Sequence, residues 1–105
     1  MPKFVYIYHG GKMPETAEEG EREMARWMAW FGEMGESVVD GGAPVGMSST
    51  VHSDGAVTPD GGANPVSGYS VVQANDLDAA IAMAKGCPVL AGGGSVEVAE
   101  RIEMV

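Results

Sequence analysis

The pattern of apolar and polar residues along the 105-residue chain predicts strands alternating with helices. The clearest unit covers residues 68–88, where the β-branched and aromatic run 69–73 is typical of a buried strand. Asn75 is the predicted N-cap of a helix, and Gly86 with Pro88 marks its end, with Gly86 in a left-handed conformation. The apolar positions of this helix recur at i, i+3, i+4 and i+7, which predicts a buried stripe: Leu77, Ala80, Ile81 and Ala84.

A similar unit opens the chain. Residues 3–8 are apolar at nearly every position, which predicts a strand covered on both faces. A long helix follows over 14–34, with Thr16 and Glu19 spaced as a capping box and Gly35 as its predicted stop. The apolar stripe of this helix is predicted to be buried: Met24, Trp27, Met28, Phe31 and Met34, with Trp30 to one side.

The middle of the chain has a different composition. Residues 37–42 predict a short strand, and residues 43–65 are then rich in Gly, Pro, Ser, Thr and Asp. Within that segment, residues 49–52 and 56–58 can pair as a hairpin across the turn signal Ser53-Asp54-Gly55.

A final strand over 95–102 follows the Gly92–Gly94 turn, with Val96, Val98 and Ile102 predicted to face the core. The complete order is the βαββαβ plan of an α+β fold, in which right-handed crossovers place two helices on one face of a ferredoxin-like antiparallel sheet. Apolar side chains on the other face, among them Tyr6 and Tyr8 or their neighbours, would then form an exposed patch. We therefore expect a homodimer in which two sheets pack face to face, a dimeric α+β barrel.

Composition and charge limit the possible functions. A chain of this length predicts one domain over 1–105, and 15 acidic against 6 basic residues give a net charge of -9. This charge argues against binding to nucleic acid or an anionic membrane, and no apolar run approaches the roughly 20 residues of a membrane span. The single Cys87 forms no internal disulfide, and no Cys/His spacing resembles a metal site. We expect a soluble cytoplasmic protein without metal or cofactor.

Several segments together resemble the YCII-related (DGPF-domain) family. The likeness spans nearly the whole chain and is most specific in the second half, in the segments 68–72, 76–80, 85–88 and 93–98, with Trp30-Phe31 and 39–42 as further matches. The resemblance implies a dimeric α+β barrel and a small protein of mostly uncharacterised function.

The chain departs from this family at two points. Of the Asp-Gly-Pro-Phe motif, Asp60-Gly61 match, while Gly62 and Ala63 replace Pro and Phe. Some members carry a proposed catalytic His–Asp pair whose His lies early in the long helix, but residues 14–34 contain no histidine.

Two residues could form a catalytic pair at the end of the first strands. His9 precedes two glycines, and an imidazole titrating near neutral pH can act as a general base. Asp40 also ends a predicted strand and could orient His9 from within hydrogen-bond reach. The alternatives are a hydrogen-bonded strand-end histidine and an aspartate that forms an Asx-turn.

Four further residues are candidates for binding a ligand. Tyr6 and Trp30 could line a cleft between the sheet and the long helix, although core packing explains either one. His52 lies beside Ser53-Asp54, and Asp60 precedes two glycines, so each could equally be a solvated loop residue. Two functions follow: binding or transformation of a small organic molecule in that cleft, or a non-catalytic dimerisation or partner-binding module.

Overall fold

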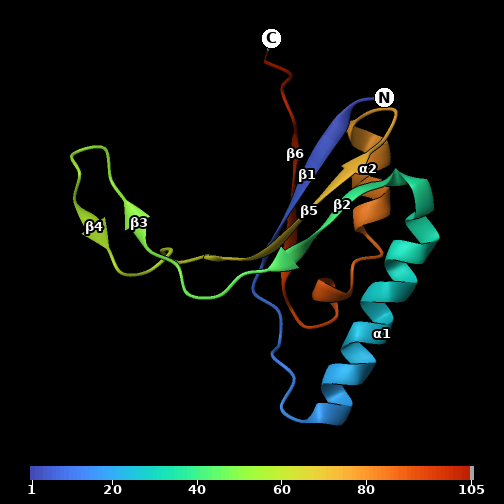
Figure 1. The fold of residues 1–105 in the computed structure, drawn as a ribbon, viewed down its shortest axis with the longest axis horizontal. Coiled ribbons are helices and arrows are strands. Elements are labelled where there is room, and N and C mark those ends of the chain that lie inside the picture. The colour runs from blue at the N-terminus through green and yellow to red at the C-terminus, as the bar shows by residue number, and fades with distance from the viewer. Residues whose placement is uncertain (105) are drawn as a thin grey trace.

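The computed structural model, which describes residues 1–104, has an α+β fold around a four-stranded antiparallel sheet (Figure 1). The strands lie side by side in the order β2-β5-β1-β6. The main elements follow the predicted order: β1 (Lys3–His9), α1 (Ala17–Met34), β2 (Val38–Pro44), β5 (Val66–Gln73), α2 (Leu77–Ala84) and β6 (Ser95–Glu100). The predicted α+β class, the antiparallel sheet and the two helices are confirmed.

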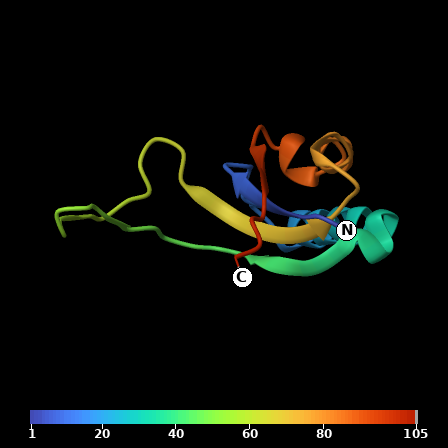
Figure 2. The ribbon, with the colours of Figure 1, turned by 90° about the horizontal axis from the view of Figure 1, so that it is seen from above.

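Both helices cover the same face of the sheet. The side chains of β1 alternate in burial, and Phe4, Tyr6 and Tyr8 point into the core. Tyr6 contacts both helices, because its ring stacks on Trp30 of α1 at 5.9 Å and its hydroxyl donates a hydrogen bond to the Ala80 carbonyl of α2. Figure 2 shows the two helices on one side of the twisted sheet.

The opposite face of the sheet has no helix over it. The register places Val5 beside Val71 and Ala99, and Ile7 beside Tyr69. We call these five residues the open face: Val5, Ile7, Tyr69, Val71 and Ala99. Tyr69 is 40% exposed, the other four are half-buried, and Glu97 lies beside Ile7 on this face. The predicted residues Tyr6 and Tyr8 belong to the covered face instead.

Strand β2 is irregular, and a glycine makes this possible. Its pairing with β5 shifts register twice, between Val38 and Asp40 and between Asp40 and Ala43. Gly42 has a φ of +70°, and a Cβ atom there would meet the carbonyl oxygen of Tyr69 at 1.8 Å. Only glycine allows the two strands to approach this closely.

The capping residues of α1 are as predicted, but the helix begins at Ala17 and not at Pro14, and its buried stripe differs. The Glu19 N–H donates to Thr16 Oγ1, and Gly35 ends the helix with a φ of +54°. The helix is rotated about its axis so that Trp30 is its buried residue, while Met24 and Met28 are 64% and 66% exposed. The prediction that these two methionines are buried is wrong, because the large Trp30 ring fills the space above Tyr6.

Helix α2 corrects three predictions. Its N-cap is Asp76, whose carboxylate accepts from the Ala79 N–H, and not Asn75. Only Ala80 and Ala84 of the predicted stripe are buried, because α2 lies close to the sheet and small residues make the contact. Gly86 is not left-handed; a Cβ atom there would instead meet Trp30 Cδ1 at 3.2 Å.

The middle segment forms the predicted hairpin from β3 (Thr50–Val51) and β4 (Val57–Thr58). Figure 1 shows this hairpin projecting from the sheet on the side away from the helices. Four apolar side chains of the segment are exposed: Val45, Met47, Val51 and Val57.

The last strand, β6, is shorter than predicted. Val96 and Val98 pack against the core as expected, but Ile102 lies beyond the strand and is 79% exposed. Two short 3-10 helices complete the structure, η1 (Gly35–Ser37) after α1 and η2 (Pro88–Leu90) after α2.

Candidate ligand-binding cleft

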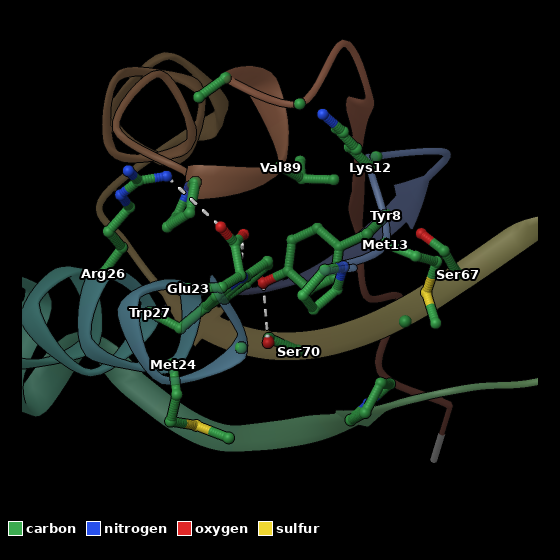
Figure 3. Close-up of a pocket in the computed structure, with 18 of the residues that line it drawn as sticks. Tyr8, Lys12, Met13, Glu23, Met24, Arg26, Trp27, Ser67, Ser70 and Val89 are labelled. Atoms are coloured by element: carbon green, nitrogen blue, oxygen red, sulfur yellow. Dashed lines mark hydrogen bonds and ion pairs between the residues drawn. The ribbon is translucent and has the colours of Figure 1, made fainter. Parts of the chain in front are cut away.

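A cavity of about 810 Å³ lies between the first half of α1, one end of the sheet and the segment around η2. Five parts of the chain surround it: the loop after β1, helix α1, the end of β2, the start of β5, and residues 88–92 (Figure 3). A site between the sheet and the long helix is where the sequence predicted a cleft. Its volume falls in the range of pockets that hold small organic molecules.

The wall of the cleft is aromatic. Trp27 meets Tyr8 edge to face at 4.9 Å and lies 5.9 Å from Phe31, centroid to centroid, and all three residues line the cavity. Trp27 in turn contacts the buried Trp30 at 5.6 Å. Because the aromatic groups support one another, the wall is held in a fixed shape.

A chain of hydrogen bonds fixes the proton of Tyr8. Ser70 Oγ donates to the Gly41 carbonyl oxygen at 2.7 Å, and Tyr8 Oη donates to Ser70 Oγ at 2.8 Å. A carbonyl oxygen can only accept, so the direction of both bonds is set. Tyr8 Oη therefore has its proton in use and offers lone pairs to any further partner.

Glu23 adds two acceptor atoms to the lining of the cleft. Its carboxylate accepts from Trp27 Nε1 at 3.2 Å and from Arg26 Nη1 at 3.5 Å. In Figure 3 dashed lines join the Glu23 carboxylate to Arg26 and Trp27. The polar centre of the cleft is thus a group of hydrogen-bond acceptors.

Positive charge gathers around this centre. Lys12, Arg22 and Arg26 line the cleft, which is half of the 6 basic residues in the chain. Only Glu19 and Glu23 of the 15 acidic residues do so. In a protein of net charge -9, the cleft therefore has a local excess of positive charge.

Two buried groups near the cleft keep their protons at neutral pH. Burial raises the pKa of Tyr8 above its usual value, so this hydroxyl is neutral and is not a base. Burial likewise raises the pKa of Cys87 to about 11, and its thiol is therefore not a thiolate nucleophile.

The structure does not bring His9 and Asp40 together. The His9 ring nitrogens contact the Asn64 carbonyl at 2.9 Å and Glu97 Oε1 at 3.0 Å, and the bond to Glu97 raises the pKa of His9. Asp40 accepts from the Gly42 N–H in an Asx-turn. By register Asp40 aligns with Val71 and Val5, four residues or about 13 Å from His9 along β1. No hydrogen bond joins the predicted pair, and neither residue lines the cleft.

Tyr6 and Trp30 are core residues. Tyr6 is fully buried, and its burial raises its pKa to about 12. Trp30 is 4% exposed, and its indole N–H donates to the Met83 carbonyl at 3.0 Å. Both lie behind the cleft wall and do not line it, because the helix rotation that buries Trp30 turns Trp27 toward the cavity.

His52 and Asp60 lie on the hairpin and do not line the cleft. His52 Nε2 shares a hydrogen bond with Thr58 Oγ1 at 2.6 Å across the hairpin. The Asp60 side chain accepts from the Gly62 N–H, and its carbonyl accepts from Thr50 Oγ1. Both residues stabilise the turn structure, and a ligand-binding role for them stays a prediction.

The site residues predicted from the sequence do not include four that line the cleft: Tyr8, Glu23, Trp27 and Ser70. Two signals were available. Ser70 is a polar residue at a core-facing position of a strand, and it is the buried polar side chain of residues 1–104. Glu23 and Trp27 are spaced i, i+4, which places them on one side of a helix.

Within residues 1–104 no cluster of three or more His, Cys, Asp or Glu side chains is arranged to hold a metal ion. No helix in that range is both long and apolar enough to cross a membrane. Comparison of the chain with protein-family models, with curated proteins and with solved structures found no match.

Proposed function

We propose that this protein binds a small organic molecule in the cleft between α1 and the end of the sheet. The observation that carries the proposal is the 810 Å³ cavity itself, in which an aromatic wall faces a few converging polar groups. Apolar walls with a small number of placed polar atoms are the usual composition of small-molecule sites. Ser70, Tyr8 and Glu23 are each held by hydrogen bonds to neighbouring groups of the protein, and this limits their reorganisation on binding.

The experiment is a binding screen followed by mapping. A library of aromatic and aliphatic fragments is added to ¹⁵N-labelled protein, and amide shifts are followed by NMR. Fragments that bind should move the signals of cleft residues such as Gly11, Gly42 and Gly92, but not those of Gly55 in the hairpin. Binders that map outside the cleft, or an absence of binders, would contradict the proposal.

A matched pair of variants sharpens the mapping. Trp27→Ala should weaken bound aromatic fragments about threefold to tenfold, because it removes an aromatic contact worth roughly 0.5–1.5 kcal/mol. Met28→Ala is the control, since Met28 is the next residue on α1, is 66% exposed and does not line the cleft. The two variants should differ in affinity while both keep a dispersed NMR spectrum.

The open face favours a second function, that of a dimerisation module. We infer that a second copy of the chain covers this face, so that the two sheets form a dimeric α+β barrel. Two observations support this occupant: the open face is apolar at its centre, and the hairpin with its exposed Val45, Met47, Val51 and Val57 projects from the same side of the sheet (Figure 1). A hairpin in that position can pack against the sheet of the second copy.

We also propose that the chain is a YCII-related protein with a ferredoxin-like sheet. The support is the strand order β2-β5-β1-β6 with two helices on one face, together with the matching segments in the second half of the sequence. The family's catalytic histidine is not carried over, since α1 contains none. Binding, and not catalysis, is therefore the function we propose.

A further inference from the structure

The donor and acceptor directions and the charge of the cleft define a class of ligand. We propose, on the basis of the small-molecule site above, that the ligand is a small aromatic acid that carries an N–H or O–H donor. Each part of this description corresponds to one feature of the cleft, and the three features are independent of one another.

The aromatic part follows from the wall. Trp27, Tyr8 and Phe31 present ring surfaces to the cavity within one connected aromatic cluster. A flat ring packs against such a wall with more contact area than a flexible chain, and edge-to-face arrangements add to the burial energy.

The donor requirement follows from the direction of the hydrogen bonds. The chain Tyr8 to Ser70 to the Gly41 carbonyl consumes the proton of Tyr8, and the Glu23 carboxylate has none to give. A ligand group that meets these atoms must donate. An acceptor placed there would face oxygen lone pairs with no proton between them, which costs binding free energy.

The acidic part follows from the charges. Lys12, Arg22 and Arg26 line the cleft, and Figure 3 shows Lys12 and Arg26 on opposite sides of Tyr8 and Glu23. Arg26 already contacts Glu23, whereas Lys12 and Arg22 form no ion pair within residues 1–104. These two cations can therefore meet an anionic group at the mouth of the cleft.

Four indole probes test the class: indole-3-acetate, indole-3-acetamide, tryptamine and 1-methylindole-3-acetate. The first three differ in charge at nearly constant shape, and the fourth lacks the ring N–H. Dissociation constants are measured by NMR titration of the ¹⁵N-labelled protein. Indole-3-acetate should bind about tenfold more tightly than the acetamide, since a charge-assisted hydrogen bond adds this much, and tryptamine should bind most weakly.

Two double variants with equal net charge separate local from general electrostatics. Lys12→Gln with Arg22→Gln should abolish the preference for the acetate over the acetamide. Lys85→Gln with Arg101→Gln removes the same charge from residues outside the cleft and should leave that preference intact. If both double variants behave alike, the cations of the cleft do not recognise the acid.

Tyr8→Phe tests the donor. The wild-type protein should bind indole-3-acetate several times more tightly than its N-methyl analogue, and Tyr8→Phe should reduce this ratio. Tyr6→Phe is the control, because the Tyr6 hydroxyl donates to the Ala80 carbonyl and Tyr6 does not line the cleft. If Tyr8→Phe leaves the ratio of the two affinities unchanged, Tyr8 does not accept a hydrogen bond from the ring N–H of the ligand.

The outcomes separate this inference from the proposed function. If the neutral or cationic indole binds the cleft as well as the acid does, the ligand class is wrong and the small-molecule site stands. If no indole moves the cleft amides, the ligand class is wrong, and the fragment screen decides the site separately. If no fragment of any class binds either, both proposals fall.

Discussion

At the scale of single residues, a single neighbouring group decides the role that several residues can play. Tyr8 Oη is an acceptor toward the cleft because it donates its hydrogen bond to Ser70 Oγ. Ser70 Oγ can accept this bond because it donates its own to the Gly41 carbonyl. Gly42 is needed because the Tyr69 carbonyl occupies the place of a Cβ atom. The six residues that the sequence predicted for the site also have structural roles, in the core, in turns or at the end of a strand.

His9 gives a prediction on pH at this scale. Its hydrogen bond to Glu97 raises its pKa, so the charged pair stabilises the fold fully below the unfolded pKa of about 6.5. The stabilisation is lost as pH rises through the folded pKa. Glu97→Gln should therefore lower the free energy of unfolding by at most about 1 kcal/mol near pH 5, since Glu97 is exposed, and by nothing at high pH.

The measurement is urea unfolding at several pH values, with an NMR titration of the His9 ring. Glu100→Gln is the control, because it removes a carboxylate from the same strand without contacting His9. A His9 pKa that does not fall in Glu97→Gln would contradict the assignment.

At the scale of elements, local sequence set where each helix and strand lies, and packing set which side of it is buried. The capping box at Thr16 and the stop at Gly35 were readable because their partners are within four residues. The exposure of Met24 and Met28 was not readable, because it depends on the fit of Trp30 over Tyr6. Helix periodicity locates the apolar stripe only approximately around the helix axis, and it therefore does not decide whether Trp30 or the two methionines face the core.

The start of α2 provides a prediction for this scale. Asp76→Ala should lower the free energy of unfolding by about 1 kcal/mol, because it removes the oxygen that accepts from the Ala79 N–H. Asn75→Ala should have little effect, since the Asn75 side chain is not the cap. Thermal and urea unfolding of the two variants compares them directly, and an equal or larger loss in Asn75→Ala would contradict the observed cap.

At the scale of the whole molecule, the sheet is covered on one face only. The helices and the core lie on the covered side, while the open face and the hairpin share the other (Figures 1 and 2). Tyr69 belongs to the open face and also lines the cleft, so a partner bound to the open face would border the ligand site. The dimer and the ligand site can each be tested without the other.

The dimer is tested by charging the open face. Wild-type protein should sediment at twice the mass of one chain. Val5→Lys should weaken the dimer at least about tenfold, because it places an unpaired charge between Val71 and Ala99 in an apolar interface. Met28→Lys, on the exposed side of α1, should leave the mass unchanged. A wild-type protein that is monomeric at all concentrations would contradict the barrel.

The sequence by itself determined the elements, their order and the α+β class, because these follow from local propensity, capping and periodicity within a few residues. It also predicted a cleft between the sheet and the long helix, but the residues named for it, Tyr6, His9, Trp30 and Asp40, do not line the cavity of the structure. Only the tertiary structure decided which residues line it, since Tyr8, Glu23 and Ser70 lie up to 62 positions apart. The rotation of α1 then exchanged the expected roles of the two tryptophans, placing Trp30 in the core and Trp27 in the cleft. Contacts between distant segments decide which residues line the cleft and which tryptophan is buried, and local sequence patterns carry no information on these contacts.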